Sequence, residues 1–298
     1  IRTAGDGPLV APSMVRDGKS TLRTIYRAGS PDPAAYAHGD GGPFVFSETY
    51  TPVNAEAVAY LARLATQPVS DEKFWIDRLF SVIKEIGIAK FDALWLHCMG
   101  AEADGLLNIL STSFPAVNNG ATFAAGRGFT TNGTTTYVDL GFDPATDGVA
   151  FLQDSALFGV YAVTNAAVSA STAGWFDGFD GISMTPRNAA FDIPFRINQE
   201  LGSTAAGTFT LPALVIPNRS GASATQLYRN GGALTVGTNP NQASTPLNSA
   251  NLQLGRITAV IYASQETALT IVGGSLTAGE HSTLYNKGIL PLMQYKGL

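Results

Sequence analysis

The chain has little of the chemistry on which small catalytic and metal sites usually depend. Its 298 residues include one cysteine, Cys98, so an intramolecular disulfide and a multi-cysteine zinc site are both excluded. The three histidines, His38, His97 and His281, lie far apart, and no local histidine motif for a metal exists. The sequence therefore offers few residues for a catalytic or metal site that depends on histidine or cysteine.

Charge is scarce as well. Charged residues make up 14% of the chain, against about a quarter in average soluble domains. The 18 Lys and Arg residues against 23 Asp and Glu residues give a net charge of −5, which argues against a nucleic-acid partner. No apolar run reaches the roughly 18 residues of a membrane helix, so we expect no membrane insertion. The hydrophobic fraction of 45% is sufficient for a folded core.

The sequence divides into three regions of different character: 1–53, 54–111 and 112–298. Frequent prolines interrupt the first region and exclude long helices there. We expect residues 1–53 to form an irregular arm that becomes ordered against a partner subunit, with a poorly ordered leader as the alternative.

The second region, 54–111, predicts helices and one strand. Asn54 is a suitable N-cap for a helix over 55–65, and Ser70 for a second helix that ends at Gly87. The second helix carries an apolar stripe at helical spacing. Residues 91–99 form an apolar run that predicts a buried strand, and residues 106–110 predict a short helical turn.

From about residue 112 the pattern is all-β, with short strands between turn residues. We predict strands at 121–126, 135–140, 149–152, 156–163, 180–185, 190–198, 207–216, 224–229, 233–236, 251–254, 257–263 and 269–274. Asn230-Gly231 predicts a tight type I′ hairpin turn. Thr277 and Glu280 match a capping box, so we expect a helix from Ala278 to about Asn286. This many short strands without long helices between them indicate a β-sandwich or jelly roll.

Three stretches carry a resemblance to a known family. They are the run from Arg127 to Pro144, the pair formed by Asn218–Gly221 and Leu227–Gly231, and the closing run from Gly273 to Tyr285. Together they resemble concanavalin-A-like (laminin-G/pentraxin-like) jelly rolls of tailed-phage virion proteins. The resemblance covers about 54–298 and implies a mainly β fold, with a small helical segment before the sandwich.

The most ligand-like segment is the loop that contains Trp175, Phe176, Asp177, Phe179 and Asp180. Aromatic rings suit the apolar face of a sugar, and fixed polar groups suit its hydroxyls. The alternative is that Trp175 and Phe176 close one end of the sandwich or contact a neighbouring subunit. Tyr228 and Tyr262 fit packing positions on strands. Arg187 and Arg196 are expected either on a polar face or as partners for Asp180 and Asp192.

Catalytic and metal sites find little support. A retaining glycosidase needs two carboxyl groups about 5–5.5 Å apart. The only glutamates in 112–298 are Glu200, Glu266 and Glu280, and they are widely separated in the sequence. Adjacent His97 and Cys98 point to opposite faces of a strand and are expected to be structural. Convergent aspartates such as Asp139, Asp177 and Asp192 leave a hydrolase open as an alternative.

Calcium is the one cofactor that the aspartates leave open. Asp139, Asp143 and Asp147 recur every fourth residue, and Asp177 and Asp180 share one loop. Calcium takes six to eight oxygen ligands, but neither cluster has the EF-hand spacing. Asp-Pro and Asp-Gly pairs are also ordinary turn chemistry, so we assign no metal.

The resemblance and the missing catalytic groups favour a non-enzymatic protein of the virion. We expect a fibre, spike or tail-tip module for adhesion to a bacterial surface glycan. Residues 1–53 would bind other virion proteins, and the chain would form a homo-oligomer, a trimer being favoured. One alternative is a purely architectural head-decoration or baseplate component, and another is a polysaccharide depolymerase.

Overall fold

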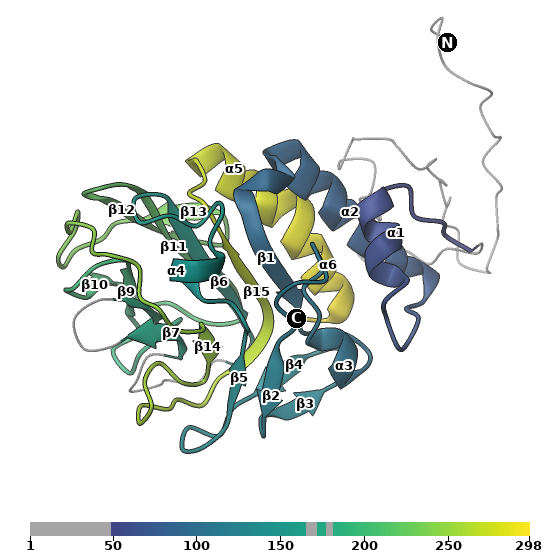
Figure 1. Cartoon of the computed structure of the whole chain (residues 1–298), viewed down its shortest axis with the longest axis horizontal. Coiled ribbons are helices and arrows are strands. Elements are labelled where there is room, and N and C mark those ends of the chain that lie inside the picture. Colours follow the sequence, from purple (N-terminus) through teal and green to yellow (C-terminus); the bar gives the residue numbers. More distant parts are fainter. Residues whose placement is uncertain (1–48, 165–171, 177–180) are drawn as a thin grey trace, which may run out of the picture. The chain divides into compact units, whose positions relative to one another are not determined.

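Two antiparallel sheets dominate the computed structural model, which describes residues 49–164, 172–176 and 181–298 (Figure 1). The larger sheet has eight strands, of which β1 pairs with β15 beside β4. In spatial order they are β13 (Gly232–Leu234), β12 (Ala224–Arg229), β11 (Ala213–Gly221), β6 (Ala156–Ala162), β15 (Glu266–Gly273), β4 (Gly128–Thr130) and β3 (Thr122–Ala124), with β1 (Phe91–Leu96) on β15.

The second sheet has seven strands and lies face to face with the first. Its order is β10 (Ser203–Ala205), β9 (Ile193–Ile197), β8 (Gly181–Met184), β7 (Ala173–Phe176), β14 (Gln253–Leu254), β5 (Tyr137–Asp139) and β2 (Val117–Asn119). The prediction of a mainly β sandwich of two antiparallel sheets, preceded by a helical segment, is therefore confirmed. Apart from 49–53, the expected irregular arm lies outside the described residues.

Most helical residues lie near the beginning or the end of the described chain, and one short helix lies between strands β5 and β6. They are α1 (Ala55–Leu61), α2 (Ser70–Ile86), the 3₁₀ turn η2 (Ile88–Lys90), α3 (Glu102–Gly105), α4 (Pro144–Asp147), α5 (Ala278–Thr283), the π-helical η3 (Leu284–Ile289) and α6 (Leu290–Lys296). None of the helices in the described ranges is long and apolar enough to cross a membrane.

The described residues contain two apolar cores, one on each side of the eight-stranded sheet. The inner core fills the space between the sheets and includes Trp95, Phe158 and Phe195. The outer core joins α2 and α6 to the opposite face of the same sheet, through residues such as Phe80 and Leu292. Each large side chain buried in this way stabilises the fold by about 1.5–3 kcal/mol relative to exposure.

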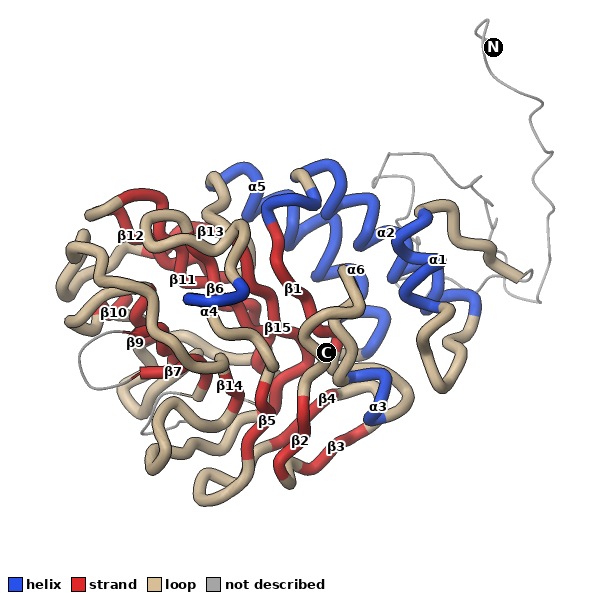
Figure 2. Tube along the Cα trace, in the orientation of Figure 1, coloured by secondary structure: helices blue, strands red, loops and turns tan. Residues whose placement is uncertain are grey.

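The helices therefore cover only one face of the sandwich. Figure 2 shows α1, α2, α5 and α6 gathered beyond β1 and β15, while mostly loops join the strands of the other sheet. Strand β1 lies in the helical segment of the sequence, yet its neighbour is β15 at the far end of the chain. The change in sequence pattern near residue 112 therefore marks a change in secondary structure, and strand pairing extends across that position.

Several local predictions are confirmed. Asn230 and Gly231 both adopt positive φ angles, 51° and 78°, as a type I′ turn requires. Thr277 and Glu280 form the reciprocal hydrogen bonds of a capping box. Helix α2 ends at Ile86, directly before Gly87, and buries Ile76, Leu79 and Ile83 of the expected stripe.

Other local predictions were wrong. Segments 149–152 and 257–263 are not strands, and each contributes one isolated bridge instead. The first helix stops at Leu61, and Ser70 begins the second helix without capping it. The C-terminal helix continues past Asn286 to Lys296, because Pro291 lies in the first turn of α6, where a missing N–H costs little.

Candidate functional site

The predicted loop contributes two described residues, which end strand β7 and point in opposite directions. Trp175 pairs with Ile182 on the side of the inner core and is partly buried against it. Phe176 pairs with Gly181 on the outer side. Asp177, Phe179 and Asp180 lie outside the described residues. The two aromatic side chains therefore do not form one stacking platform, because neighbouring strand residues face opposite sides.

Glycines set the position of both aromatic residues. Gly174 has a φ of 117°, and a Cβ there would lie 2.0 Å from the carbonyl oxygen of Ile182. A Cβ on Gly181 would lie 2.5 Å from the carbonyl oxygen of Trp175. Real Cβ atoms do not approach oxygen so closely, so glycine is needed at both positions for the backbones of β7 and β8 to meet.

The outer face of the seven-stranded sheet is open only in the sense that no described helix covers it, because its centre is buried: Ser183 is 2% and Gln253 4% exposed, whereas Arg196, Phe176 and Asp139 are partly exposed. In the described part of the chain, no helix packs extensively against it. Strand register places a row of mostly polar residues across this face, each opposite the next on the neighbouring strand. The row is Arg196, Ser183, Gly174, Gln253 and Asp139. We call this surface the open face.

One arginine of the open face stacks on Phe176. The Arg196 guanidinium carbon lies 4.0 Å from the centre of the Phe176 ring. Its Nε donates a hydrogen bond to the carbonyl oxygen of Glu200 at 3.0 Å. Burial of the guanidinium lowers the pKa of Arg196, although the group stays charged at neutral pH. The ring and the carbonyl together hold the cation in a fixed orientation.

A second arginine lies in a cluster of aromatic rings. The Arg256 guanidinium carbon is 3.6 Å from the ring centre of Tyr137, 5.8 Å from Trp175 and 5.9 Å from Tyr262. Its Nε donates to the Gln253 Oε1 at 2.6 Å. A cation over an aromatic face is stabilised by about 0.5–2 kcal/mol. The rings and the amide therefore orient this guanidinium as well.

Neither arginine has a carboxylate partner among the described residues. Their hydrogen bonds go to a carbonyl, an amide and a hydroxyl. Elsewhere on the molecule cations pair with glutamates, as in Lys84–Glu56, Arg127–Glu266 and Lys287–Glu85. The open face thus presents positive charge on a chain whose net charge is −5.

The structure tests only part of the expected pairing of Arg187 and Arg196 with Asp180 and Asp192, because Asp180 lies outside the described residues. Arg196 stacks on Phe176, and the Arg187 guanidinium carbon lies 4.3 Å from the ring centre of Phe191. Asp192 accepts a hydrogen bond from the backbone of Gly207. Tyr228 is a packing residue, as predicted, whereas Tyr262 lies in a loop beside Arg256 and not in a strand.

The three aspartates that recur every fourth residue, Asp139, Asp143 and Asp147, accept hydrogen bonds mainly within their own turns. Asp139 accepts from the Gly141 backbone and from Asn251, both at 2.9 Å. Asp143 caps α4, and Asp147 accepts from the backbone of Asp143. No group of three His, Cys, Asp or Glu residues in the described ranges could hold a metal ion. The Asp177 and Asp180 part of the calcium hypothesis lies outside these ranges.

His97 and Cys98 are both buried, on opposite sides of the eight-stranded sheet. The His97 ring nitrogens contact the Gly105 carbonyl oxygen at 2.8 Å and the Thr270 hydroxyl at 3.0 Å. Burial lowers the pKa of His97 to about 4 and raises the pKa of Cys98 to about 12. A neutral imidazole and a protonated thiol without access to solvent act as structural groups.

The glutamates of the sandwich are engaged separately. Glu266 accepts hydrogen bonds from Nε and Nη2 of Arg127, at 2.6 and 2.8 Å. Glu280 belongs to the capping box and pairs with Lys90, whereas Glu200 is exposed. These three carboxylates therefore show no arrangement with one acid and one nucleophile beside a common cleft.

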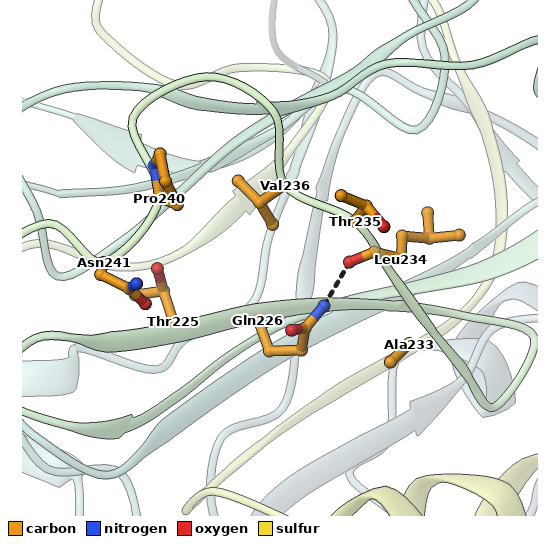
Figure 3. Close-up of a pocket in the computed structure, with 8 residues that line it drawn as sticks. All are labelled: Thr225, Gln226, Ala233, Leu234, Thr235, Val236, Pro240 and Asn241. Carbon is orange, nitrogen blue, oxygen red and sulfur yellow. Dashed lines mark hydrogen bonds between the residues drawn. The ribbon is translucent and has the colours of Figure 1, made fainter.

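A shallow hollow lies at the edge of the sandwich beside β12 and β13 (Figure 3). Its lining residues are neutral: Thr225, Gln226, Ala233, Leu234, Thr235, Val236, Pro240 and Asn241. Gln226 spans β12 and the end of β13 by donating to the Leu234 carbonyl oxygen. The hollow presents no titratable group and cannot perform acid–base chemistry.

Comparisons with known proteins support the architecture. No protein-family model and no curated protein sequence matches this chain. Among solved structures, a mutant Trypanosoma rangeli sialidase with trans-sialidase activity has a TM-score of 0.51 at 11% identity. The match covers 80% of this chain and 37% of the sialidase, so the chain spans little more than a third of that protein.

Two further structures are similar at lower scores. Domain 4 of AbnA, a GH43 arabinanase from Geobacillus stearothermophilus in complex with arabinotriose, has a TM-score of 0.46 and 16% identity, with 66% of this chain and 99% of that domain covered. The binding domain of botulinum neurotoxin serotype D has a TM-score of 0.46 and 11% identity, with coverage of 67% and 53%. The likeness to the sialidase shows a shared fold, which is that of a β-sandwich.

Proposed function

We propose that this chain is an adhesion module that binds a glycan on the open face of its seven-stranded sheet. One observation carries the proposal: two arginines, Arg196 and Arg256, are held in fixed orientations by aromatic rings on a face that no described helix covers. A guanidinium offers several N–H donors to sugar hydroxyls, and Phe176 beside Arg196 and Tyr262 beside Arg256 add apolar surface. Such a preorganised site loses little entropy when a ligand binds.

The proposed setting is the particle of a tailed phage. The support is the resemblance of the sequence to concanavalin-A-like virion proteins, which also suggests a fibre, spike or tail-tip position. In this proposal residues 1–53 bind other virion proteins, and the module acts as a homo-oligomer, with a trimer favoured. It holds a bacterial surface glycan and does not cleave it.

A glycan array probed with the full chain tests the adhesion. We expect binding to a restricted set of bacterial surface glycans, weakened by the double variant Arg196→Gln/Arg256→Gln. The matched control is Arg78→Gln, which removes an arginine from α2 on the helical side. A chain that binds no glycan, or a double variant that binds as well as the parent, would refute this site and favour an architectural role.

Two further assays test the setting and the chemistry. A chain without residues 1–53 should fail to enter particles, as measured by immunoblotting of purified virions. Incubation of the chain with the glycan that it binds should release no reducing ends. Normal incorporation would remove the attachment role of the arm, and release of reducing ends would establish a depolymerase.

A further inference from the structure

The open face has a charge preference that the proposed function leaves undefined. Resting on that function, we propose that its ligand is an acidic glycan, and that Arg256 binds the carboxylate of a sugar unit. Arg196 provides a second cationic contact further along the same chain of sugars. The inference depends on which N–H groups of each guanidinium remain unused and on how the cations are distributed over the molecule.

The outer edge of the Arg256 guanidinium is free to bind an anion. An arginine side chain has five N–H donors. The Nε of Arg256 is used by Gln253, and one Nη1 proton makes a long contact of 3.5 Å with the Tyr262 hydroxyl. Nη2 has no partner among the described residues. The terminal Nη1–Nη2 edge therefore keeps the parallel pair of donors that matches the two oxygens of a carboxylate.

Packing holds that edge in place before any ligand arrives. The guanidinium lies 3.6 Å from the centre of the Tyr137 ring, and its side chain is half-buried. Stacking and the bond to Gln253 fix both the plane of the group and its rotation within that plane. A flexible surface lysine would have to be ordered on binding, whereas this arginine is already oriented.

The local charge balance favours an anion. Asp139 lies opposite Gln253 in the strand register, but its Oδ1 accepts from Gly141 and Asn251, and it makes no ion pair with Arg256. Arg196 is likewise without a carboxylate in the described ranges. An unneutralised cation on a sheet face repels cationic ligands and attracts a carboxylate more strongly than a neutral hydroxyl.

The spacing of the two arginines suggests an extended ligand. Strands β9, which carries Arg196, and β14, which precedes Arg256, are separated by β8 and β7. Neighbouring strands lie about 4.8 Å apart, so the backbones that carry the two arginines are roughly 14 Å apart. Both guanidinium groups lie near β7, where Arg196 stacks on Phe176 and Arg256 is 5.8 Å from the Trp175 ring centre. An acidic oligosaccharide of two or more units can therefore contact both cations.

Calorimetry with matched ligands tests the inference. The probes are trigalacturonic acid, a hyaluronan tetrasaccharide and 3′-sialyllactose, each compared with its carboxyl-reduced form, which is neutral and otherwise the same. We expect the full chain to bind at least one acidic form and to lose roughly tenfold to a hundredfold in affinity when the carboxylate is reduced.

Variants identify the arginine responsible. Arg256→Gln should weaken binding of the acidic form by the same factor and weaken binding of the neutral form far less, and Arg196→Gln should have a smaller effect on the acidic form. Arg78→Gln should change nothing. Equal binding of an acidic form and its reduced form, or an Arg256→Gln variant that binds the acid normally, would overturn the acidic preference and leave glycan adhesion intact. Silence toward every glycan would overturn both.

Discussion

Arg219 of β11 donates a hydrogen bond through its Nε to the carbonyl oxygen of Ile197 in β9, at 2.8 Å, so one side chain joins the two sheets. Arg219 is fully buried. Its remaining donors go to the carbonyl oxygens of Gly221, Ala222 and Gln242 and to the Gln199 side chain. Burial lowers the pKa of this arginine, and five oxygen acceptors compensate for the lost water.

Replacement of Arg219 by methionine should therefore destabilise the sandwich severely. Methionine keeps much of the volume but leaves several buried oxygens without donors, at about 1–3 kcal/mol each. We expect the free energy of unfolding to fall by about 3 kcal/mol or more, measured by urea denaturation. Arg78→Gln should change it by less than about 0.5 kcal/mol. An unchanged urea midpoint for Arg219→Met would contradict this account of the contact.

The buried histidines should make the fold sensitive to mild acid. Burial lowers the pKa of His97 to about 4 and that of His281 to about 3, from a usual value near 6.5. In the unfolded chain both take up protons near pH 6.5, whereas in the folded chain they stay neutral. Their contribution is complete above pH 6.5 and is lost as the pH falls toward 4, by up to about 1.4 kcal/mol per pH unit for each histidine.

Replacement of His281 by phenylalanine removes one of these two proton-binding groups. The His281 ring stacks on Tyr228 with ring centres 3.7 Å apart, and neither ring nitrogen has a hydrogen-bond partner in the described structure. His281→Phe should keep the stacking and preserve stability at pH 7. Between pH 6.5 and 4.5 it should reduce the slope of the unfolding free energy against pH by the amount that corresponds to one bound proton, up to about 1.4 kcal/mol per pH unit. An identical slope in the variant would show that His281 is not buried in the neutral form.

Cys98 should be inert in the native protein. It is completely buried in the outer core, and burial raises its pKa to about 12, so almost no thiolate exists at neutral pH. A thiol reagent such as DTNB at pH 8 should label the chain only after denaturant is added. Rapid stoichiometric labelling without denaturant would mean that α2 and the sheet separate readily in solution.

Gly174 should tolerate no side chain. With a φ of 117° and a Cβ site 2.0 Å from the carbonyl oxygen of Ile182, alanine there must push β7 away from β8. We expect Gly174→Ala to cost about 2–4 kcal/mol in unfolding free energy and to alter the fluorescence of neighbouring Trp175. Gly237→Ala is the matched control, because nothing lies within 4 Å of its Cβ site. Equal stability of the two variants would argue against the close approach of these strands.

Local sequence signals located several parts of the fold well. The Asn230-Gly231 turn, the capping box of α5 and the apolar stripe of α2 each depend on residues within a few positions of one another. The short strands β2, β4, β7 and β10 were missed because three or four residues, often including glycine, carry no clear alternation. The pairing of such strands can come from distant partners, such as Gln253 opposite Gly174 in the register of β14 and β7.

The candidate site was harder to predict for the same reason. The sequence drew attention to Trp175 and Phe176 as neighbours, but a strand places them on opposite sides. The Arg256 cluster gathers Tyr137, Trp175, Gln253 and Tyr262 from separate segments, and no spacing rule connects them. The sequence offered only a weak signal, which was a glycine, Gly255, directly before Arg256. In the structure this glycine has a φ of 79° and turns the chain after the two-residue strand β14.

The pairing of β15 with both β6 and β1 has a consequence for synthesis of the chain. Residues 266–273 form the inner strand against which β1 and β6 close, so both neighbours wait for a segment translated more than a hundred residues later. Long-range pairing of this kind slows folding. During translation the apolar edges of β1 and β6 remain open until β15 has emerged from the ribosome. Over that interval nascent chains are most prone to pair with one another.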